Sequence, residues 1–410
     1  MEGSARGRRP LDGIRVLDFT RFLAGPYLTR ALAVMGADVI KIERPPHGDE
    51  QRGHPYFIQG QSGYFLQQNH DKRGLCMDLK RPEAQAAARE LATASDVVVE
   101  NFRPGVMARM GLDYPVLSAL NPRLIYCSVS SFGQNGPYAE RPGYGIIADA
   151  LSGALHITGF PDQPPPLIRM PVADTLTGIH GVAAVCAALY AREKTGEGQH
   201  IDIALLDCMF SLHEYAIQEF LLSEGKVEAT RIGSGLPGSV PYGVFAGRDG
   251  CLVLGAPSDQ NWAQVCQAMG RPALAMDPRY VSNAERSRRQ SEVYRLVQDW
   301  VMQCPSIREA LRRLEAAGVP CAPVQSIREV VEDPQIAARG MIVEMDHPVA
   351  GKVRLPNLPF HFSRADTTPQ RPAPLLGQHN HEVLREVLGY SEEQVAGLER
   401  SGALYAEPEV

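Results

Sequence analysis

The sequence predicts an α/β fold with a parallel central sheet, together with a second and smaller domain. Apolar runs at residues 14–20 and 36–44 are typical of buried strands, and residues 24–35 between them carry a helical pattern with a proline in its first turn. Strand, helix and strand at this spacing form a βαβ unit, whose two strands are parallel. The 410 residues are enough for two domains, and after about residue 242 the pattern changes to a hairpin-like region and several helices.

Further elements extend the predicted sheet. Residues 82–94 follow an amphipathic helical pattern, residues 96–102 and 124–129 are strand-like, and a short helix runs to Met110. Ligands of open parallel sheets bind outside the carboxyl ends of the strands. Polar residues at or near these ends are Arg21, Arg44, Asn101 and Arg109. Together they predict a site for a phosphorylated ligand, although each residue alone is typical of a solvated surface.

A nicotinamide dinucleotide is not the expected ligand. Glu43, at the end of the second strand, has the residue type that binds a ribose in such proteins. The glycine fingerprint that should follow the first strand is absent, because residues 19–25 contain a single glycine.

The stretch around Asp174 lies near the middle of the chain. Residues 182–190 are small and apolar on all sides, which predicts a buried helix. Asp174 falls where this helix would begin. Its carboxylate can either accept hydrogen bonds from the first backbone N–H groups as a cap or have a chemical role. The helix dipole is expected to keep it ionised. Gly178 and Gly181 each weaken a helix by about 1 kcal/mol relative to alanine. We therefore expect them to make room for a partner or a ligand.

The later part of the chain predicts the domain boundaries. A turn at residues 195–199 precedes a strand at 200–205 and a helix from 207 to about 223. Residues 233–242 are rich in glycine, proline and serine, which is typical of a boundary or an active-site lid. We expect a large domain in residues 1–225, a small domain with its linkers in residues 226–324, and a C-terminal part in residues 325–410.

Composition excludes several classes of protein. The formal net charge of −6 argues against nucleic-acid binding. Eight cysteines without a C-x-x-C pair fit reduced thiols in a reducing compartment, so we expect a cytoplasmic protein. Charged or polar residues interrupt every long apolar run, which predicts no membrane span, and the basic N-terminus is not a secretory signal. His379 and His381 have no evident third ligand, so a surface role is favoured over a metal site.

Short motifs follow one another along nearly the whole chain. They are residues 11–20, Ala24-Gly25-Pro26, residues 36–43, Asn69-His70-Asp71-Lys72-Arg73, residues 100–105, Gly143-Tyr144 with residues 151–153, residues 195–199 and residues 374–379. In residue types and order these motifs resemble the class III CoA-transferases, the CaiB/BaiF family.

The resemblance implies a Rossmann-like large domain built from both ends of the chain, a smaller α+β domain, and a homodimer whose subunits interlock as rings. It places the family's nucleophile at Asp174. The implied CoA contacts are Arg21, Phe22, Leu23, Ala24, Arg44, Lys80, Asn101, Phe102 and Arg109. Candidates for the substrate pocket are Tyr64, Tyr144, Arg169, Gly233, Gly235 and Gly238.

The implied reaction moves CoA from an acyl-CoA to a small carboxylic acid through an anhydride and a thioester on Asp174. No permanently bound cofactor or metal is expected, because the CoA thioester is the substrate. Residues 238–242 are similar to the branch of the family that uses succinate and glutarate, whereas Arg21 and Leu23 depart from the formyl/oxalate branch. The second carboxylate of a dicarboxylic acceptor would bind Arg169, or alternatively Arg21, with a surface loop arginine as the other interpretation of Arg169.

Two other functions stay open at this point. Acyl-CoA racemases of the same family use a histidine about thirty residues before the aspartate, where this chain has Tyr144. Tyrosine is a poor base near neutral pH, because its pKa is about 10. A CoA-binding protein without catalytic activity is the second alternative.

Overall fold

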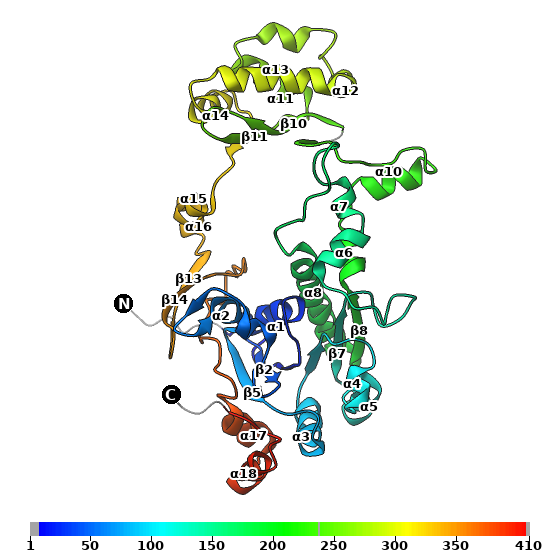
Figure 1. Cartoon of the computed structure of the whole chain (residues 1–410), viewed down its shortest axis with the longest axis vertical. Helices are drawn as coiled ribbons and strands as arrows, with labels where there is room; N and C mark the ends of the chain where they lie inside the picture. Colours follow the sequence, from blue (N-terminus) through cyan, green and yellow to red (C-terminus); the bar gives the residue numbers. More distant parts are fainter. Residues whose placement is uncertain (1–7, 237, 407–410) are drawn as a thin grey trace. The chain divides into compact units, whose positions relative to one another are not determined.

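The fold is given by a computed structural model that describes residues 8–236 and 238–406. The chain forms two compact units, and Figure 1 colours it along the sequence. The first unit comprises the residues up to Gly153, Ile168–His213 and the residues from Gln335 onward, and the second comprises Ala154–Leu167 and Glu214–Pro334. The predicted small domain, residues 226–324, lies within the second unit.

A six-stranded parallel sheet forms the centre of the first unit. Its strands lie in the order β5-β2-β1-β6-β7-β8, and every neighbouring pair is parallel. The strands are β1 (Arg15–Asp18), β2 (Asp38–Glu43), β5 (Lys72–Cys76), β6 (Val97–Glu100), β7 (Ile125–Ser130) and β8 (Gln199–Ala204). The predicted α/β class and parallel sheet are confirmed. The edge strand β5 was not predicted, because it begins with Lys72 and Arg73 and lacks an apolar run.

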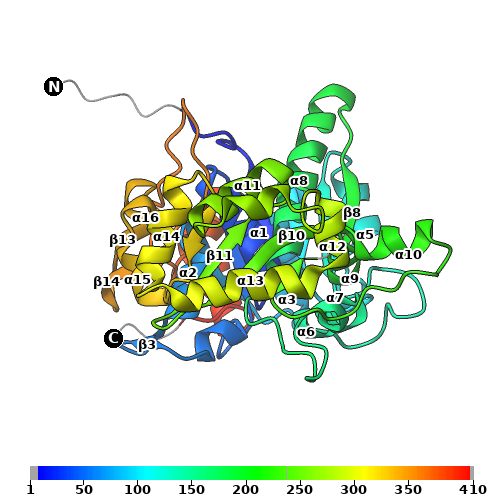
Figure 2. The same cartoon turned by 90° about the horizontal axis from the view of Figure 1, so that it is seen from above.

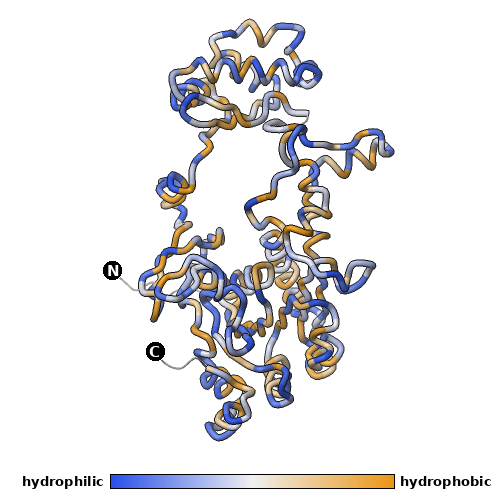
Figure 3. The backbone as a smooth tube through the Cα atoms, in the orientation of Figure 1, coloured by the Kyte–Doolittle hydropathy of each residue, from blue (hydrophilic) through white to orange (hydrophobic). Residues whose placement is uncertain are grey.

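Helices cover the sheet, as a parallel sheet with buried strands requires. The helices of this part of the chain are α1 (Ala24–Val34), α2 (Gly63–Asn69), α3 (Pro82–Thr93), α4 (Val106–Arg109), α5 (Tyr114–Leu120), α6 (Gly145–Leu151), α8 (Val172–Thr195) and α9 (Leu205–Ser211). A short 3₁₀ turn, η1 (Glu50–Gly53), and a small hairpin, β3 (Phe57–Ile58) with β4 (Gln61–Ser62), follow β2. Hydrophobic residues dominate the inner strands, and Figure 3 colours the backbone by hydropathy. Val16, Leu17 and Val97–Val99 are fully buried.

Helix α8 packs against α1, β7 and β8. A Cβ on Gly178 would crowd Tyr27 and the carbonyl of Ala24, and one on Gly181 would overlap Leu28. The partner for which the two glycines make room is therefore helix α1. The helix is not buried on all sides as predicted, since Ile179 is 50% exposed in the single chain.

Within the described residues, α8 is also the one helix long and apolar enough to cross a membrane. The test considers length and composition only, and a helix packed on a sheet passes it too. The absence of a membrane span stays a prediction.

The C-terminal part returns to the first unit. Its elements are α16 (Pro334–Ala338), β13 (Ile342–His347), β14 (Gly351–Pro356), α17 (Asn380–Leu388) and α18 (Glu392–Arg400). Buried residues of the β13–β14 hairpin share a core with Phe65 and Leu66 of α2, and α17 lies beside β5 and α3 (Figure 1). His379 accepts a hydrogen bond from the Gly74 amide, and His381 pairs with Glu399. Residues 8–236 and 238–406 contain no group of three or more side chains suited to hold a metal.

The second unit is an antiparallel sheet covered by helices. Its strands lie in the order β12-β11-β10-β9, and Figure 2 shows α11 and α13 lying over β10 and β11. The elements are α7 (Ala154–Ile157), α10 (Ala216–Leu222), β9 (Gly235–Leu236), β10 (Ser239–Ala246), β11 (Cys251–Gly255), α11 (Asp259–Ala268), η2 (Pro272–Met276), α12 (Asn283–Arg288), α13 (Gln290–Gln303), α14 (Ile307–Ala316), β12 (Cys321–Pro323) and α15 (Ile327–Glu332). Its core centres on Trp262, which is fully buried.

Two predicted elements differ from the structure here. The helix predicted from 207 to about 223 is two helices, because the chain passes from the first unit to the second after His213. The segment 233–242, predicted as a loop, contributes β9 and the start of β10, which pair antiparallel. Local packing explains why the strands pair here. Gly235 lies so close to Tyr294 that a Cβ would crowd the Tyr294 hydroxyl, and the Ser234 carbonyl accepts a hydrogen bond from the Val244 amide.

Candidate active site

Asp174 lies in the first turn of α8 and lines a cavity of about 180 Å³. The N-cap residue of this helix is Pro171, which makes no side-chain cap. Asp174 is therefore not the N-cap residue. The other residues that line the cavity are Arg21, Phe22, Leu23, Ala24, Asn101, Phe102, Arg103, Val129, Ser130, Ser131, Pro142, Gly143, Tyr144 and Leu205.

A second cavity of about 540 Å³ lies in the same unit and shares Arg21 and Phe102 with the first. Its polar lining includes Arg44, Asp78, Lys80, Gln85 and Arg109. Each of the nine predicted CoA contacts lines at least one of the two cavities. The structure thus brings together residues that lie far apart in the sequence, at the carboxyl ends of the strands.

The pKa of Asp174 is raised from 3.8 to about 6. Burial is the larger cause, because it removes the carboxylate from water, and the nearby charge of Asp149 is the second. The expected effect of the helix dipole, which favours the anion, is therefore outweighed. With a pKa of about 6, about nine-tenths of the Asp174 side chains are still ionised at pH 7.

Gly145 lies directly against the Asp174 carboxylate. A Cβ on this glycine would overlap Asp174 Oδ2. Gly145 is the first residue of α6, and the residue before it, Tyr144, lines the Asp174 cavity. The absence of a side chain at position 145 is what lets α6 approach the nucleophile candidate.

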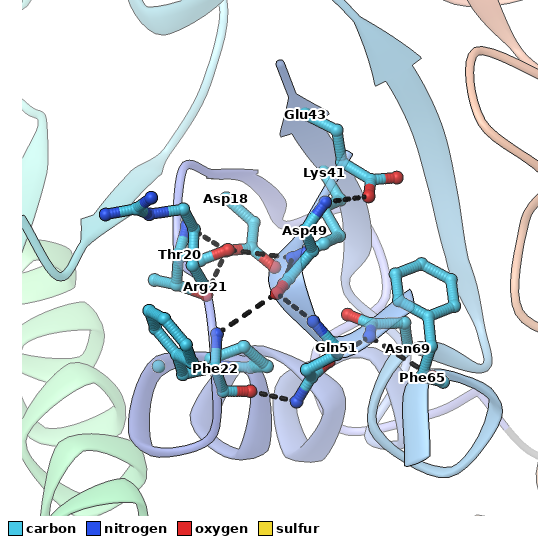
Figure 4. A network of polar contacts seen from close by, with 12 residues as sticks. Asp18, Thr20, Arg21, Phe22, Lys41, Glu43, Asp49, Gln51, Phe65 and Asn69 are labelled. Carbon is cyan, nitrogen blue, oxygen red and sulfur yellow. Dashed lines mark hydrogen bonds and ion pairs between the residues drawn. The ribbon is translucent and has the colours of Figure 1, made fainter. Parts of the chain in front are cut away.

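Buried polar side chains hold the segment that leads into α1, as Figure 4 shows. Lys41 Nζ lies 2.8 Å from Asp49 Oδ2 and donates to the Thr20 carbonyl at 2.7 Å. Asp49 Oδ1 accepts from the Phe22 amide at 3.2 Å, and Gln51 donates to the Phe22 carbonyl. Phe22 has φ = 61°, a left-handed conformation that costs energy for a bulky residue. Both of its backbone polar groups are thus bound while it holds that conformation.

Arginine side chains of the larger cavity are also paired. Glu50 Oε1 lies 2.8 Å from Arg21 Nη1 and 2.8 Å from Arg44 Nη2. The Arg21 guanidinium lies 5.0 Å from the centre of the Phe102 ring, a cation–π distance. Two cations and one carboxylate leave one net positive charge, which suits an anionic ligand such as a phosphate.

The remaining predicted pocket residues lie in several places. The Phe22 and Tyr144 rings make an edge contact at 5.6 Å. Tyr64 in α2 has its pKa raised to about 12, by burial first and by the charge of Asp174 second. Arg169 is exposed and lines neither cavity. Gly233, Gly235 and Gly238 belong to the second unit, and their role in the substrate pocket stays a prediction.

Sequence reasoning missed part of the site. Arg103, Ser130 and Ser131 line the Asp174 cavity. Ser130 is the last residue of β7, Ser131 follows it, and Arg103 lies in the loop after β6. The rule that ligands bind at strand ends could have found them. Asp149 lies on helix α6, which was not predicted, so nothing in the sequence pattern indicated that Asp149 belongs to the site.

The geometry describes a carboxylate in a small cavity that shares two residues with a larger cavity lined by cationic side chains. The sequence profile of CoA-transferase family III matches residues 11–380. The chain belongs to CoA-transferase family III. It is accordingly an enzyme, and the CoA-transferases that it resembles act on a CoA thioester and a carboxylic acid.

Relatives in CoA-transferase family III match over nearly the full chain. The succinyl-CoA:glutarate CoA-transferase of Mus musculus is 37% identical over 97% of this chain and 90% of that protein. The succinate–glutarate CoA-transferase of Agrobacterium fabrum is 40% identical over 92% of this chain and 96% of that protein. The crystal structure of a CaiB/BaiF family protein from Brucella suis has a TM-score of 0.81 and 34% identity, over 93% of this chain and 100% of that chain.

Proposed function

We propose that the protein transfers CoA from succinyl-CoA or a similar acyl-CoA to a small dicarboxylic acid, with Asp174 as the nucleophile. The observation that carries the proposal is the position of Asp174 in a cavity that shares Arg21 and Phe102 with the larger cavity of cationic side chains. The similarity to two glutarate CoA-transferases supports the choice of acids.

The two cavities suit the two ends of an acyl-CoA. The phosphates would bind among Arg44, Lys80 and Arg109 in the larger cavity, where guanidinium and ammonium groups can pair with them. The acyl group would then enter the smaller cavity, where Asp174 lies. Arg21 and Phe102 would contact the part of the ligand that passes from one cavity to the other.

The chemistry follows from the carboxylate. An Asp174 oxygen attacks the thioester carbonyl, the C–S bond breaks, and CoA leaves as a thiolate, so Asp174 becomes a mixed anhydride. The thiolate then attacks the Asp174 carbonyl of the anhydride, which gives an aspartyl-CoA thioester and releases the first acid. The acceptor carboxylate repeats the two steps in reverse. Splitting one exchange into such steps is how covalent catalysis lowers the barrier.

Arg169, and Arg21 second, stay our candidates for the second carboxylate of the acceptor. A change of Arg169→Ala is then expected to slow transfer to glutarate more than transfer to a monocarboxylic acid of the same length. Equal loss for both acids would remove Arg169 from the proposal.

We also propose a homodimer. Helix α8 exposes Ile179 and Tyr190, at 50% and 68%, in the single chain, and a second copy that covers them would remove apolar surface from water. Sedimentation velocity at micromolar concentration measures this directly, and a monomer at about 45 kDa would contradict it.

The test of the nucleophile combines kinetics with trapping. Succinyl-CoA and glutarate are mixed with the wild-type protein and with the Asp174→Asn variant, and glutaryl-CoA is measured by chromatography. Hydroxylamine added to the wild-type reaction is expected to leave a hydroxamate on Asp174, detected by mass spectrometry. Asp207→Asn is a matched control, because Asp207 is a carboxylate in the first turn of a neighbouring helix and lines neither cavity. Native activity in Asp174→Asn, or a hydroxamate elsewhere, contradicts the proposal.

A further inference from the structure

We propose that Asp149 is a positioning residue that holds the start of α8 and destabilises the anion of Asp174, so that this carboxylate is more reactive. The inference rests on the proposed role of Asp174 as the nucleophile. In this inference, the negative charge of Asp149 raises the free energy of the ionised Asp174 carboxylate before the reaction.

The geometry begins with helix α6. Gly145 and Asp149 are four residues apart, so they lie on the same face of this helix, one turn from each other. Gly145 touches the Asp174 carboxylate, and α6 packs against α8. The face that carries Asp149 is therefore turned toward the first turn of α8.

Asp149 is 3% exposed, and its Oδ1 atom has no hydrogen-bond partner among the described residues. The amide of Ala173 lies close enough to the carboxylate to lower its pKa, which limits the rise that burial causes. Since Pro171 provides no side-chain cap, Asp149 supplies an acceptor to the start of α8 from another helix. This contact ties Asp149 to the residue that directly precedes Asp174.

No cation compensates the two carboxylates. Within residues 8–236 and 238–406, neither Asp149 nor Asp174 forms an ion pair with a lysine, arginine or histidine. The ionisable side chains that face Asp174 from the surrounding elements are Arg21 and Arg103 across the cavity, Tyr144 before α6 and Tyr64 in α2. The ionisable side chains on α1 and α9 include Tyr27, which faces Gly178, and Asp207, whose pKa is raised first by burial and second by the charge of Asp202. None of these groups raises the pKa of Asp174, which is raised first by burial and second by the charge of Asp149.

Repulsion of this kind assists the first chemical step. Before the reaction, the negative charge of Asp174 faces that of Asp149. As the Asp174 oxygen bonds to the thioester carbon, the charge moves to the carbonyl oxygen and leaves with the CoA thiolate when the C–S bond breaks. The neutral anhydride no longer repels Asp149, so an unfavourable interaction of the ground state is lost on the way to the transition state. A more basic carboxylate is also the better nucleophile.

The experiment is the pH profile of kcat/KM in Asp149→Asn. The asparagine keeps an acceptor for the Ala173 amide and removes the charge. We expect the acid limb of the profile to move to lower pH by roughly 0.5–1 unit, so that activity at pH 5 relative to pH 8 rises about three- to fivefold. The plateau activity is expected to fall by about two- to tenfold, because the nucleophile is less basic. Asp207→Asn, which removes a carboxylate that lines neither cavity, is expected to keep the wild-type profile.

Three outcomes are distinguishable. An acid limb identical to that of the wild type in a folded Asp149→Asn protein overturns the inference. Should the asparagine variant not fold, Asp149→Ser keeps an uncharged acceptor in a smaller side chain and must show the same shift. If instead Asp174→Asn retains activity, the proposed function fails, and it fails independently of any result at position 149.

Discussion

The side-chain amide of Asn101 binds both backbone polar groups of Arg21. Its Oδ1 accepts from the Arg21 amide at 2.8 Å, and its Nδ2 donates to the Arg21 carbonyl at 2.7 Å. Asn101 directly follows β6 and Arg21 follows the neighbouring strand β1, so the contact joins two strand ends of the sheet. Because Arg21 lines both cavities, this one side chain sets the position of the residue that lies between them.

Asn101→Ala is expected to weaken binding of the acyl-CoA. The change removes two hydrogen bonds to Arg21, and each is worth about 1 kcal/mol, so the KM for the acyl-CoA should rise about 10- to 30-fold. Initial rates over a range of succinyl-CoA concentrations measure it. Asn121→Ala is the control, since Asn121 also donates to two backbone carbonyls but lies outside both cavities. A KM that changes equally in both variants would show that Asn101 has no special role.

The buried ion pair of Lys41 and Asp49 gives a stability prediction. Both side chains are inaccessible to water, and burial alone would lower the pKa of Lys41, but the charges of Asp49 and Asp18 raise it. Lys41→Met leaves the Asp49 carboxylate buried without its cation, which should cost about 3–5 kcal/mol in the free energy of unfolding, measured in urea. The exposed pair of Lys352 and Glu344 provides the contrast, since Lys352→Met should cost less than about 1 kcal/mol. Similar losses in the two variants would be evidence against the network of Figure 4.

Gly145→Ala should separate activity from stability. The added methyl group overlaps Asp174 Oδ2, so the carboxylate must turn away and kcat should fall by about 100-fold or more. Alanine is the better helix former by about 1 kcal/mol, so the free energy of unfolding should change little. Gly397→Ala in α18, where the methyl group would make only an ordinary contact at 4.0 Å with the Arg400 side chain, is expected to keep full activity. An active Gly145→Ala enzyme would mean that the Asp174 position seen here is not the reactive one.

The pKa of Asp174 predicts the acid limb of the reaction. The nucleophile is the ionised carboxylate, so activity is lost as the pH falls through a pKa of about 6. At pH 5 only about a tenth of the enzyme carries the anion, and kcat/KM should be about a tenth of its plateau value. Rates between pH 4.5 and 8.5 check this in the free enzyme. An acid limb near pH 4, the ordinary range of aspartate, would show that Asp174 is hydrated or is not the essential nucleophile.

Glu100 predicts a pH-dependent stability. This side chain is 4% exposed, and burial raises its pKa from 4.5 to about 7, although Ser128 and the Phe102 amide lower it in part. The folded protein therefore binds a proton more strongly than the unfolded chain, and stability falls as the pH rises from about 4.5 to 7. Glu100→Gln removes this decline and should add about 2–3 kcal/mol at pH 8 relative to pH 5. Urea unfolding at both pH values measures it, with Glu83→Gln, on the exposed start of α3, as a control that should not alter the slope.

Much of the large unit was predictable because its signals are local. Apolar runs reveal β1, β2, β6 and β7, since strands buried on both faces need nearly continuous hydrophobic sequence. Their carboxyl ends lead to Arg21, Arg44 and Asn101, which line the two cavities. Strand β5 was not predicted, because it begins with the charged residue Lys72. The burial of Lys72 depends on a tertiary contact, the ion pair with Asp18 at 3.0 Å.

The sequence by itself determined the parallel sheet, the family and the identity of the carboxylate at the start of a small-residue helix. Those properties follow from periodicity and motifs, which neighbouring residues along the chain carry. Only the tertiary structure decided that Asp174 lies against Gly145, that Asp149 faces the same helix start, and that the pKa is raised rather than lowered. The physical reason is that burial and nearby charge depend on which residues meet in space, and no single segment of the sequence contains both members of such a contact.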